Sequence, residues 1–308
     1  MSDVVEILLA TYNGAAFLEE QLDSILAQTD NGWHLTISDD GSNDSTPEII
    51  NRYVLRYPDR IACYRSGRRF GNARDHFFQL LAQCDAEHML LCDQDDVWYP
   101  EKVRRMRKAF LQVEAEAGAD TPILVFSDQT PTDAMLRPLA TSLMRYQKQH
   151  FKHFDYRSIL MQNVVTGGAM GINRALVRLA ECSKGIPGIY MHDWWLATVA
   201  ARFGRIVYID EPLGVYRQHE NNVEGAKNVG SLGYFARRTR ALGEVRHTIL
   251  RKKAQAEAFE RTFEAKLSSK DIAFLREFTR TRSGIFFWLK YQHLIHGAVR
   301  KVGMLLLC

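Results

Sequence analysis

Short apolar runs alternate with amphipathic stretches through the first two thirds of the chain. The apolar runs are rich in leucine and β-branched residues, which suit the buried faces of strands. Segment 15–28 instead places Phe17, Leu22 and Ile25 on one face of a helix, and three later segments behave similarly. The predicted strands are 4–9, 35–37, 61–64, 88–92, 123–126 and 206–209, and the predicted helices are 15–28, 45–57, 72–84 and 100–117.

This alternation predicts an α/β fold with a mostly parallel sheet covered by helices on both faces. Ligands of such sheets bind beyond the carboxyl ends of the strands. Strand signals become rare after about residue 225, and the segment 225–233 holds three glycines. We therefore predict an α/β domain over 1–224, with a donor half (1–100) and an acceptor half (101–224), followed by a helical region over 225–308.

Composition excludes several classes of protein. The 308 residues are 46% hydrophobic, enough for a substantial core and too many for a disordered or collagen-like chain. The start of the chain lacks the basic region and cleavage site of a signal peptide. The cysteines are odd in number and form no CxxC pair, which favours a reducing cytosol over a disulfide framework; they are Cys63, Cys84, Cys92, Cys182 and Cys308.

Charge is distributed unevenly. The net charge is only +4, too small to indicate a nucleic-acid partner, yet residues 221–308 carry 17 basic and 7 acidic side chains. No acidic residue follows Glu277, and an apolar stripe lies opposite Lys290, Arg300 and Lys301 on a helical wheel. This pattern predicts an interfacial helix at a membrane surface, with docking on the α/β body as the alternative; the stripe consists of Trp288, Tyr291, Ile295, Val299, Val302 and Leu306.

Three carboxylates follow the apolar run 89–92. Asp93, Asp95 and Asp96 would repel one another at the end of a buried strand, and a divalent cation would remove that cost. Hard oxygen ligands of this kind suit Mg²⁺ or Mn²⁺. The alternative is that Asp96 caps the helix that follows.

Tyr12 and Asp40 follow the first two predicted strands. The Tyr12 ring offers a face on which a nucleobase can stack, and a free carboxylate can accept the imide N–H of uracil or thymine. For Asp39, a turn-forming role is an equal alternative to a ligand role. Arg74 begins a predicted helix, where a guanidinium and a helix N-terminus suit a diphosphate, with a surface salt bridge as the alternative.

Six short motifs, taken in order, resemble those of bacterial family 2 glycosyltransferases, especially the rhamnosyltransferase-like members of surface polysaccharide assembly. The resemblance covers residues 4 to about 223. It implies a GT-A fold, a nucleotide-sugar donor, a divalent metal and inversion at the anomeric carbon. The motifs are ATYNG (10–14), QLDSIL (21–26), SDDGS (38–42), DQDDVW (93–98), HDWW (192–195) and YRQH (216–219).

The same resemblance assigns roles to individual residues. Asp193 matches the catalytic base, although a helix cap with buried tryptophans beside it is the alternative. The metal ligands it implies are Asp95, Asp96 and His219, with an ordinary surface or core role as the alternative for His219. The donor-binding candidates, with Arg74 added on its own chemistry, are Thr11, Tyr12, Asn13, Asp40, Arg74, Asp93 and Asp95. Those on the acceptor side are Gly167, Gly168, Trp194 and Trp195, with packing as the alternative role of the glycines.

The expected activity is transfer of L-rhamnose from dTDP-L-rhamnose to a hydroxyl of a glycan or polyprenyl-linked glycan. The enzyme is expected in the cytoplasm, peripheral on the inner leaflet of the cytoplasmic membrane. A hexose from a UDP donor is the alternative substrate, and a non-catalytic nucleotide-sugar or membrane-surface binding protein is the alternative class. A nucleotidyltransferase would need a triphosphate-binding loop after the first strand, which Thr11 to Gly14 does not supply.

Overall fold

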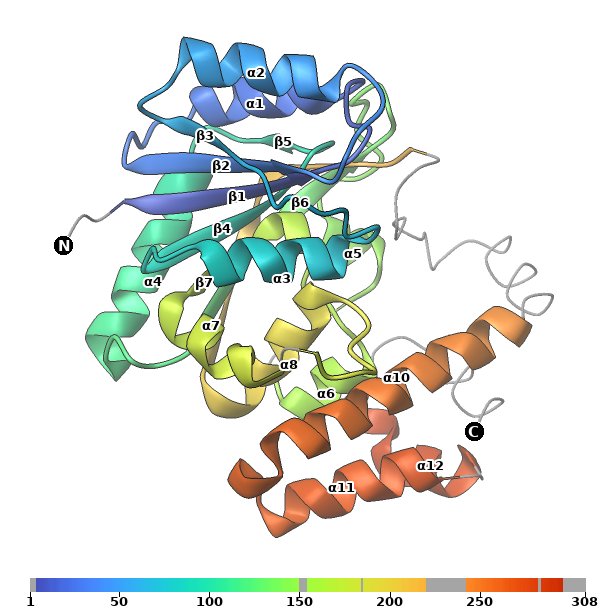
Figure 1. Cartoon of the computed structure of the whole chain (residues 1–308). Coiled ribbons are helices and arrows are strands. Elements are labelled where there is room, and N and C mark those ends of the chain that lie inside the picture. The colour runs from blue at the N-terminus through green and yellow to red at the C-terminus, as the bar shows by residue number, and fades with distance from the viewer. Residues whose placement is uncertain (1–3, 150–153, 184, 220–241, 282–283, 296–308) are drawn as a thin grey trace.

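The computed structural model describes residues 4–149, 154–183, 185–219, 242–281 and 284–295. Within these residues, eight strands form one sheet in the order β3-β2-β1-β4-β7-β6-β8-β5, with helices on both faces (Figure 1). The α/β fold expected from the sequence is confirmed. The strands are β1 (Val5–Thr11), β2 (Trp33–Asp39), β3 (Ile61–Tyr64), β4 (His88–Asp93), β5 (Val97–Trp98), β6 (Ile123–Thr132), β7 (Met170–Asn173) and β8 (Arg205–Arg217).

The first four strands in this order pair in parallel, and β6 also pairs in parallel with β8. The intervening strand β7 runs antiparallel to both β4 and β6. Short β5 is antiparallel to β8. All six predicted strands are present, whereas β5 and β7 were not predicted. Strand β5 has only two residues, and β7 (MGIN) holds a glycine and too few apolar residues to indicate a strand.

Successive residues of β1 belong to opposite layers of the core. Ile7 and Leu9 pack in the layer of α1 (Leu18–Leu26), α2 (Thr46–Arg56) and α4 (Lys102–Ala117). Leu8 packs in the layer of α3 (Ala73–Gln83) and α8 (His192–Phe203). The remaining helices of the body are α5 (Leu143–Tyr146), α6 (Tyr156–Met161) and α7 (Arg174–Ala180).

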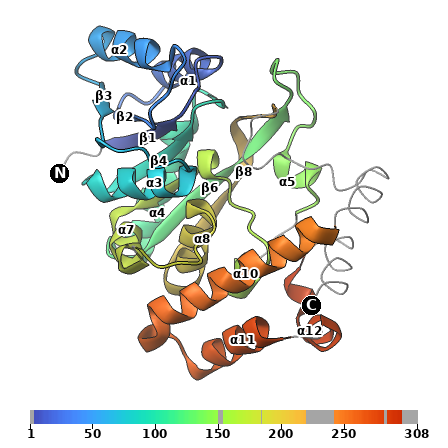
Figure 2. The same cartoon turned by 45° about the vertical axis from the view of Figure 1, so that its right-hand side comes forward.

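In the described residues after the α/β body there are three helices: α10 (Leu242–Phe263), α11 (Ser269–Arg280) and α12 (Gly284–Tyr291). Figure 2 shows α10 running along the body beside α8, and Figure 1 shows α6 next to it. Phe259 and Phe263 of α10 pack on Trp195 of α8, and Tyr156 of α6 stacks on Phe259 with ring centroids 5.8 Å apart. The helices therefore share one apolar core with the body.

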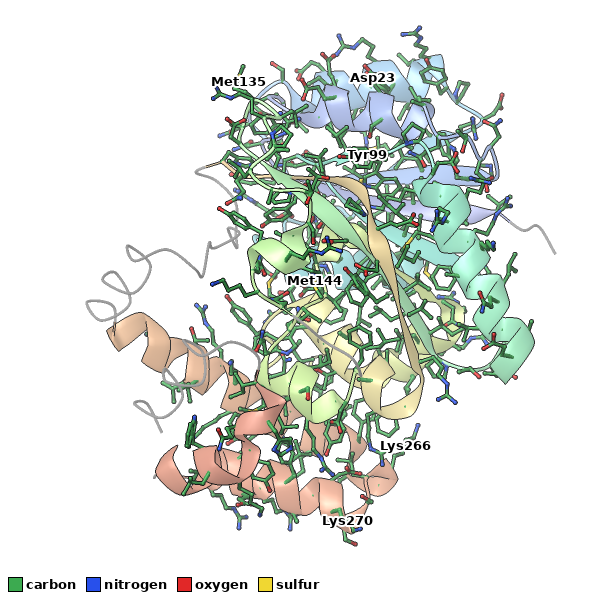
Figure 3. All side chains as sticks on the ribbon, turned by 180° about the vertical axis from the view of Figure 1, so that it is seen from behind. Asp23, Tyr99, Met135, Met144, Lys266 and Lys270 are labelled. Atoms are coloured by element: carbon green, nitrogen blue, oxygen red, sulfur yellow. The ribbon has the colours of Figure 1, made fainter. Side chains whose placement is uncertain are left out.

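The described part of the predicted interfacial stripe faces this core. Trp288 and Tyr291 pack against it and Ile295 is buried within it, as the docking alternative expected. Lys266 and Lys270, at the turn between α10 and α11, point away from the body (Figure 3). Val299, Val302 and Leu306, like the predicted boundary at 225–233, lie outside the described residues. Among the helices that are described, we find none with the length and apolar content to span a membrane.

Asp271 of α11 is a polar link between these helices and the body. Its carboxylate accepts hydrogen bonds from the Tyr156 hydroxyl (2.8 Å), from Arg202 (2.8 Å) and from the Ser268 hydroxyl (2.7 Å). Burial alone would raise the pKa of Asp271, but the hydrogen bonds from Ser268, Tyr156 and Arg202 outweigh burial and hold this pKa well below its usual range.

We expect Asp271→Asn to lower the free energy of unfolding by about 3 kcal/mol at pH 7, because it leaves buried donors without their anion. A depressed pKa stabilises the fold above about pH 4 and loses that effect as the pH falls toward the folded-state pKa. The difference in the free energy of unfolding between variant and wild type, measured by denaturant unfolding, should therefore shrink below about pH 4. Asp120→Asn, at an exposed turn, is the control and should match the wild type at every pH; a deficit that stays constant to pH 3 would contradict this account.

Candidate active site

The predicted acidic cluster lies where β4 ends. Asp93 is the last residue of β4, and Asp95 and Asp96 lie in the turn to β5. Asp96 is buried and accepts hydrogen bonds from Gln129 Nε2 (3.0 Å) and from the backbone N–H of Arg217 (3.3 Å). Asp96 thus bonds to β6 and β8 and caps no helix.

Burial and mutual repulsion perturb these carboxyl groups. Burial is the main cause that raises the pKa of Asp93 to about 7, and the charges of Asp95 and Asp193 raise it further. Burial, followed by Asp95 and Asp93, also raises the pKa of Asp96 well above its usual range. The predicted base and the predicted donor carboxylates therefore lie in one electrostatic neighbourhood.

Lys102, which sequence reasoning missed, is the buried cation of this neighbourhood. It has no exposed surface, donates from Nζ to the Gly168 carbonyl (2.6 Å) and lies 3.9 Å from the centroid of the Trp98 ring. Burial lowers its pKa to about 8, against the opposing influence of Cys92, Asp96 and Asp93. A signal existed in the sequence, because Lys102 falls on the same helical face as Met106, which is buried on α4.

Gly168 fits between two of the carboxylates. A Cβ at this position would be 2.7 Å from Asp96 Oδ2 and 2.8 Å from Asp93 Oδ2, so no other residue leaves both side chains in place. The Gly168 N–H also hydrogen-bonds to Asp93. At neighbouring Gly167, a Cβ would lie 3.1 Å from His192 Nε2. The glycines predicted on the acceptor side thus lie against the donor carboxylates.

Asp95 and His219 lie side by side, with 2.7 Å between Asp95 Oδ2 and His219 Nε2. The imidazole stacks on Phe17 at a centroid distance of 4.7 Å. A carboxylate beside an imidazole is a donor pair that suits Mn²⁺ or Mg²⁺, which usually take their other ligands from water and phosphate oxygens. In the part of the chain that the structure describes, no three His, Cys, Asp or Glu side chains converge to enclose a metal.

Arg217 fixes the backbone around this pair. Its guanidinium donates to the carbonyls of Asp95 (2.8 Å) and Ala134 (3.0 Å), forms an ion pair with Glu20, and lies 4.7 Å from the centroid of the Phe17 ring. In the sequence, Arg217 stands out only as part of the YRQH motif (216–219). A buried arginine at the end of β8 instead ties the predicted metal ligands to the body.

The predicted nucleobase site lies at the ends of β1 and β2. Tyr12 is 41% exposed, and the guanidinium of Arg69 lies 4.5 Å from the centroid of its ring. Asp40 is buried and accepts the backbone N–H groups of Phe70 (2.5 Å) and Gly71 (2.7 Å). Asp40 therefore holds the loop that brings Arg69 over Tyr12, a contact the sequence did not reveal.

The turn after β1 is fastened to the acidic loop through Gln94. Thr11 Oγ1 donates to Gln94 Oε1 (2.6 Å), which also accepts the backbone N–H of Tyr12 (2.9 Å). Asn13 has a positive φ of 48° and accepts the N–H of Asn43 (2.9 Å). These bonds join the carboxyl ends of β1, β2 and β4 into one rim.

Arg74 lies in the first turn of α3. Its guanidinium pairs with Asp75 (2.8 Å) and donates from Nη1 to the carbonyl of Ile189 (2.6 Å). Arg74 thus forms the salt bridge that the alternative interpretation predicted, and it makes a second contact as well. The second contact links α3 with the loop that leads to α8.

Asp193 lies in the first turn of α8, after an N-cap at Met191 that makes no side-chain bond. Asp193 Oδ2 accepts from Asn163 Nδ2 (3.3 Å) and Oδ1 accepts the backbone N–H of Trp194 (2.6 Å). Met191 and not Asp193 is therefore the N-cap residue, although the Asp193 carboxylate accepts one N–H of the first turn.

The two tryptophans are buried, as the core alternative expected. Trp194 Nε1 donates to the Ile159 carbonyl (2.7 Å) and Trp195 Nε1 donates to Ser183 Oγ (3.0 Å). The neighbouring His192 packs on Phe77 with ring centroids 4.3 Å apart, and burial lowers its pKa to about 3, so its imidazole is neutral at physiological pH. No described residue offers a hydrogen-bond partner to either of its ring nitrogens.

Comparison with known proteins agrees with this architecture. Residues 6–178 match the model of the family described as Glycosyl transferase family 2. The chain is 31% identical over 255 residues to the dTDP-rhamnosyl transferase RfbG of Shigella flexneri, covering 79% of this chain and 81% of that protein. The chain belongs to glycosyl transferase family 2.

Solved structures show the same GT-A fold. TarS 1-349 of S. aureus in complex with UDP-GlcNAc has a TM-score of 0.56 and 15% identity over 98% of this chain and 89% of the other. The mannosyltransferase PcManGT of Pyrobaculum calidifontis, in complex with GDP-Man and Mn²⁺, has a TM-score of 0.52 and 16% identity over 98% and 86%. The family and the fold are thereby confirmed, while the roles of individual residues stay predictions.

Proposed function

We propose that this chain is a divalent-metal-dependent, inverting rhamnosyltransferase that uses dTDP-L-rhamnose. The choice of donor rests on the similarity to RfbG, which extends over most of both chains. The charge of Asp193 raises the pKa of Asp93 at the end of β4, so the two carboxylates lie near one another. This proximity supports a single catalytic centre. A hydroxyl of a glycan or polyprenyl-linked glycan is the proposed acceptor.

In this proposal, Asp193 takes the proton of the acceptor hydroxyl as its oxygen attacks the anomeric carbon. The bond from that carbon to the diphosphate breaks on the opposite face, and dTDP leaves with the electron pair, so the configuration inverts. Asn163 orients the Asp193 carboxylate. Tyr12, with Asp40 holding the loop above it, receives the thymine ring.

Asp95 and His219 would hold the metal, with Asp96 behind them fixing the turn. A bound divalent cation supplies charge neutralisation for the departing diphosphate.

A position on the cytoplasmic face of the membrane stays a prediction, and it now depends on residues beyond the described part of the chain.

The donor assignment can be tested without knowing the acceptor. Binding and slow hydrolysis of dTDP-rhamnose, UDP-glucose, UDP-galactose, UDP-GlcNAc and GDP-mannose should be measured with Mn²⁺, with Mg²⁺ and with EDTA. We expect dTDP-rhamnose to bind at least tenfold more tightly than the others, and only with metal. Asp95→Asn should abolish the increase in donor binding and hydrolysis that the metal causes. Asp59→Asn, at an exposed turn, should leave that increase unchanged.

Preference for a UDP-hexose would show that the donor assignment is wrong, while the assignment as a glycosyltransferase would stand. Binding of nucleotide sugars without any turnover, alone or with candidate acceptors, would favour the non-catalytic alternative. Binding of none would overturn the proposal.

A further inference from the structure

A short loop, residues 185–191, leads directly into α8 and Asp193. We infer that α10, from the C-terminal region, is part of the catalytic unit, and that Gln255 and Arg251 are positioning residues that hold this loop and thereby place Asp193. This inference rests on the proposed role of Asp193. No relative's name and no matched family segment assigns such a role, since the family match ends at residue 178.

Three side chains of α10 bind the loop. Gln255, which has no exposed surface, accepts the backbone N–H of Tyr190 at Oε1 (3.2 Å). Arg251 donates from Nη1 to the Tyr190 hydroxyl (2.7 Å), and its guanidinium lies 4.4 Å from the ring centroid. Arg261 donates to the Pro187 carbonyl (2.9 Å). Both the backbone and the side chains of the loop are therefore held from α10.

The loop backbone also lies directly against the helix. Gly188 has a φ of +100°, and a Cβ there would be 2.7 Å from the carbonyl oxygen of Ala254. Only glycine accommodates both this conformation and this approach. The contact sets the distance between the loop and α10 without a side chain in between.

A second segment beside Asp193 is held from the same helix. Lys252 donates from Nζ to the carbonyl of Met161 at the end of α6, two residues before Asn163. Asn163 in turn donates to Asp193 Oδ2. Thus α10 contacts both the loop before the predicted base and the segment that orients its carboxylate.

The predicted donor-binding residues other than Arg74 are anchored elsewhere. Tyr12, Asp40 and Asp95 lie at the ends of β1, β2 and β4, and no contact with α10 is found among their hydrogen bonds. Loosening α10 should therefore change turnover more than donor binding. Arg74 bonds to Ile189 from the opposite side and keeps the loop near α3.

The test compares full-length Gln255→Met and Arg251→Met with the wild type. We expect amide exchange over residues 189–191 to accelerate at least tenfold in Gln255→Met, because the Tyr190 N–H loses its acceptor. We also expect kcat for metal-dependent donor hydrolysis to fall about tenfold in both variants, while KM for the donor stays within twofold. Lys253→Met is the matched control, because Lys253 bonds to the Thr281 carbonyl and not to the loop.

Rescue separates positioning from general damage. Gln255→Glu keeps an acceptor oxygen and should restore most of the protection at Tyr190. Equal losses in kcat and donor affinity, or wild-type exchange and kcat in both methionine variants, would overturn the inference. Arg251 is exposed, so its variant tests the idea even if Gln255→Met does not fold. If the wild type neither hydrolyses a donor nor transfers its sugar to a candidate acceptor, the proposed function fails, and the exchange measurement still decides whether α10 holds the loop.

Discussion

Asp193→Asn is expected to lower the turnover of sugar transfer by about 10² to 10⁴-fold, the usual contribution of a positioned general base. The substitution preserves the shape of the side chain and keeps one oxygen for the Trp194 N–H, while its NH2 group replaces the oxygen that accepts the Asn163 amide at 3.3 Å. Apart from that one hydrogen bond, it removes the ability to take a proton. Donor affinity should therefore stay close to that of the wild type, because the predicted donor residues other than Arg74 are anchored at the ends of β1, β2 and β4.

The measurement is a comparison of kcat and donor KM for hydrolysis, and for transfer once an acceptor is known. Asp210→Asn, at an exposed position of β8, is the matched control. Transfer near the wild-type rate in Asp193→Asn would remove Asp193 from the base role. Asp93, with a pKa near 7 and next to Asp193 in the electrostatic network, would then be the group to test.

Lys102→Met is expected to lower the free energy of unfolding by about 3 kcal/mol at pH 8. Methionine fills a similar volume, but it leaves the carboxylates of Asp93 and Asp96 without their buried cation and the Gly168 carbonyl without its donor. The loss in the free energy of unfolding should become smaller as the pH falls toward 5. Raised pKa values mean that Asp93 and Asp96 gain protons well above pH 4, and the neutral acids no longer need a counter-charge.

Urea denaturation of the metal-free protein at pH 8 and pH 5 measures this difference. Lys108→Met is the control, because Lys108 lies on the exposed side of the same helix and should change stability by less than about 0.5 kcal/mol. An equal loss for Lys102→Met at both pH values would mean that packing, and not charge, is what Lys102 contributes.

The sequence predicted the parts of this fold that repeat a period over many residues. Every long strand and all four predicted helices are present, and the helix ends lie within three residues of the prediction. By contrast, β6 and β8 continue six and eight residues beyond their predicted ends. It did not predict β7, whose four residues are buried throughout and show no alternation. Without β7, the antiparallel centre of the sheet could not be foreseen.

The same contrast holds for the site. Residues at strand ends, such as Asp95 and Tyr12, were predicted because the strand before them shows where the chain leaves the core. Lys102, Arg217 and Gln255 were missed because their roles depend on partners about 65 to 120 positions away in the chain. Only the folded chain reveals that a lysine next to Glu101 is buried under an acidic cluster.

The reversed direction of β7 has a consequence for how acceptor specificity can diversify. A parallel strand delivers its outgoing loop to the rim of the sheet that binds ligands, whereas an antiparallel strand delivers its incoming loop there. Gly167 and Gly168 precede β7 and reach the carboxylates for this reason. The stretch from α6 to Gly167 can thus change at positions other than Asn163 without altering the register of any strand. The predicted donor rim is fixed by parallel strands, whereas the register of a strand does not fix the chain on its other side.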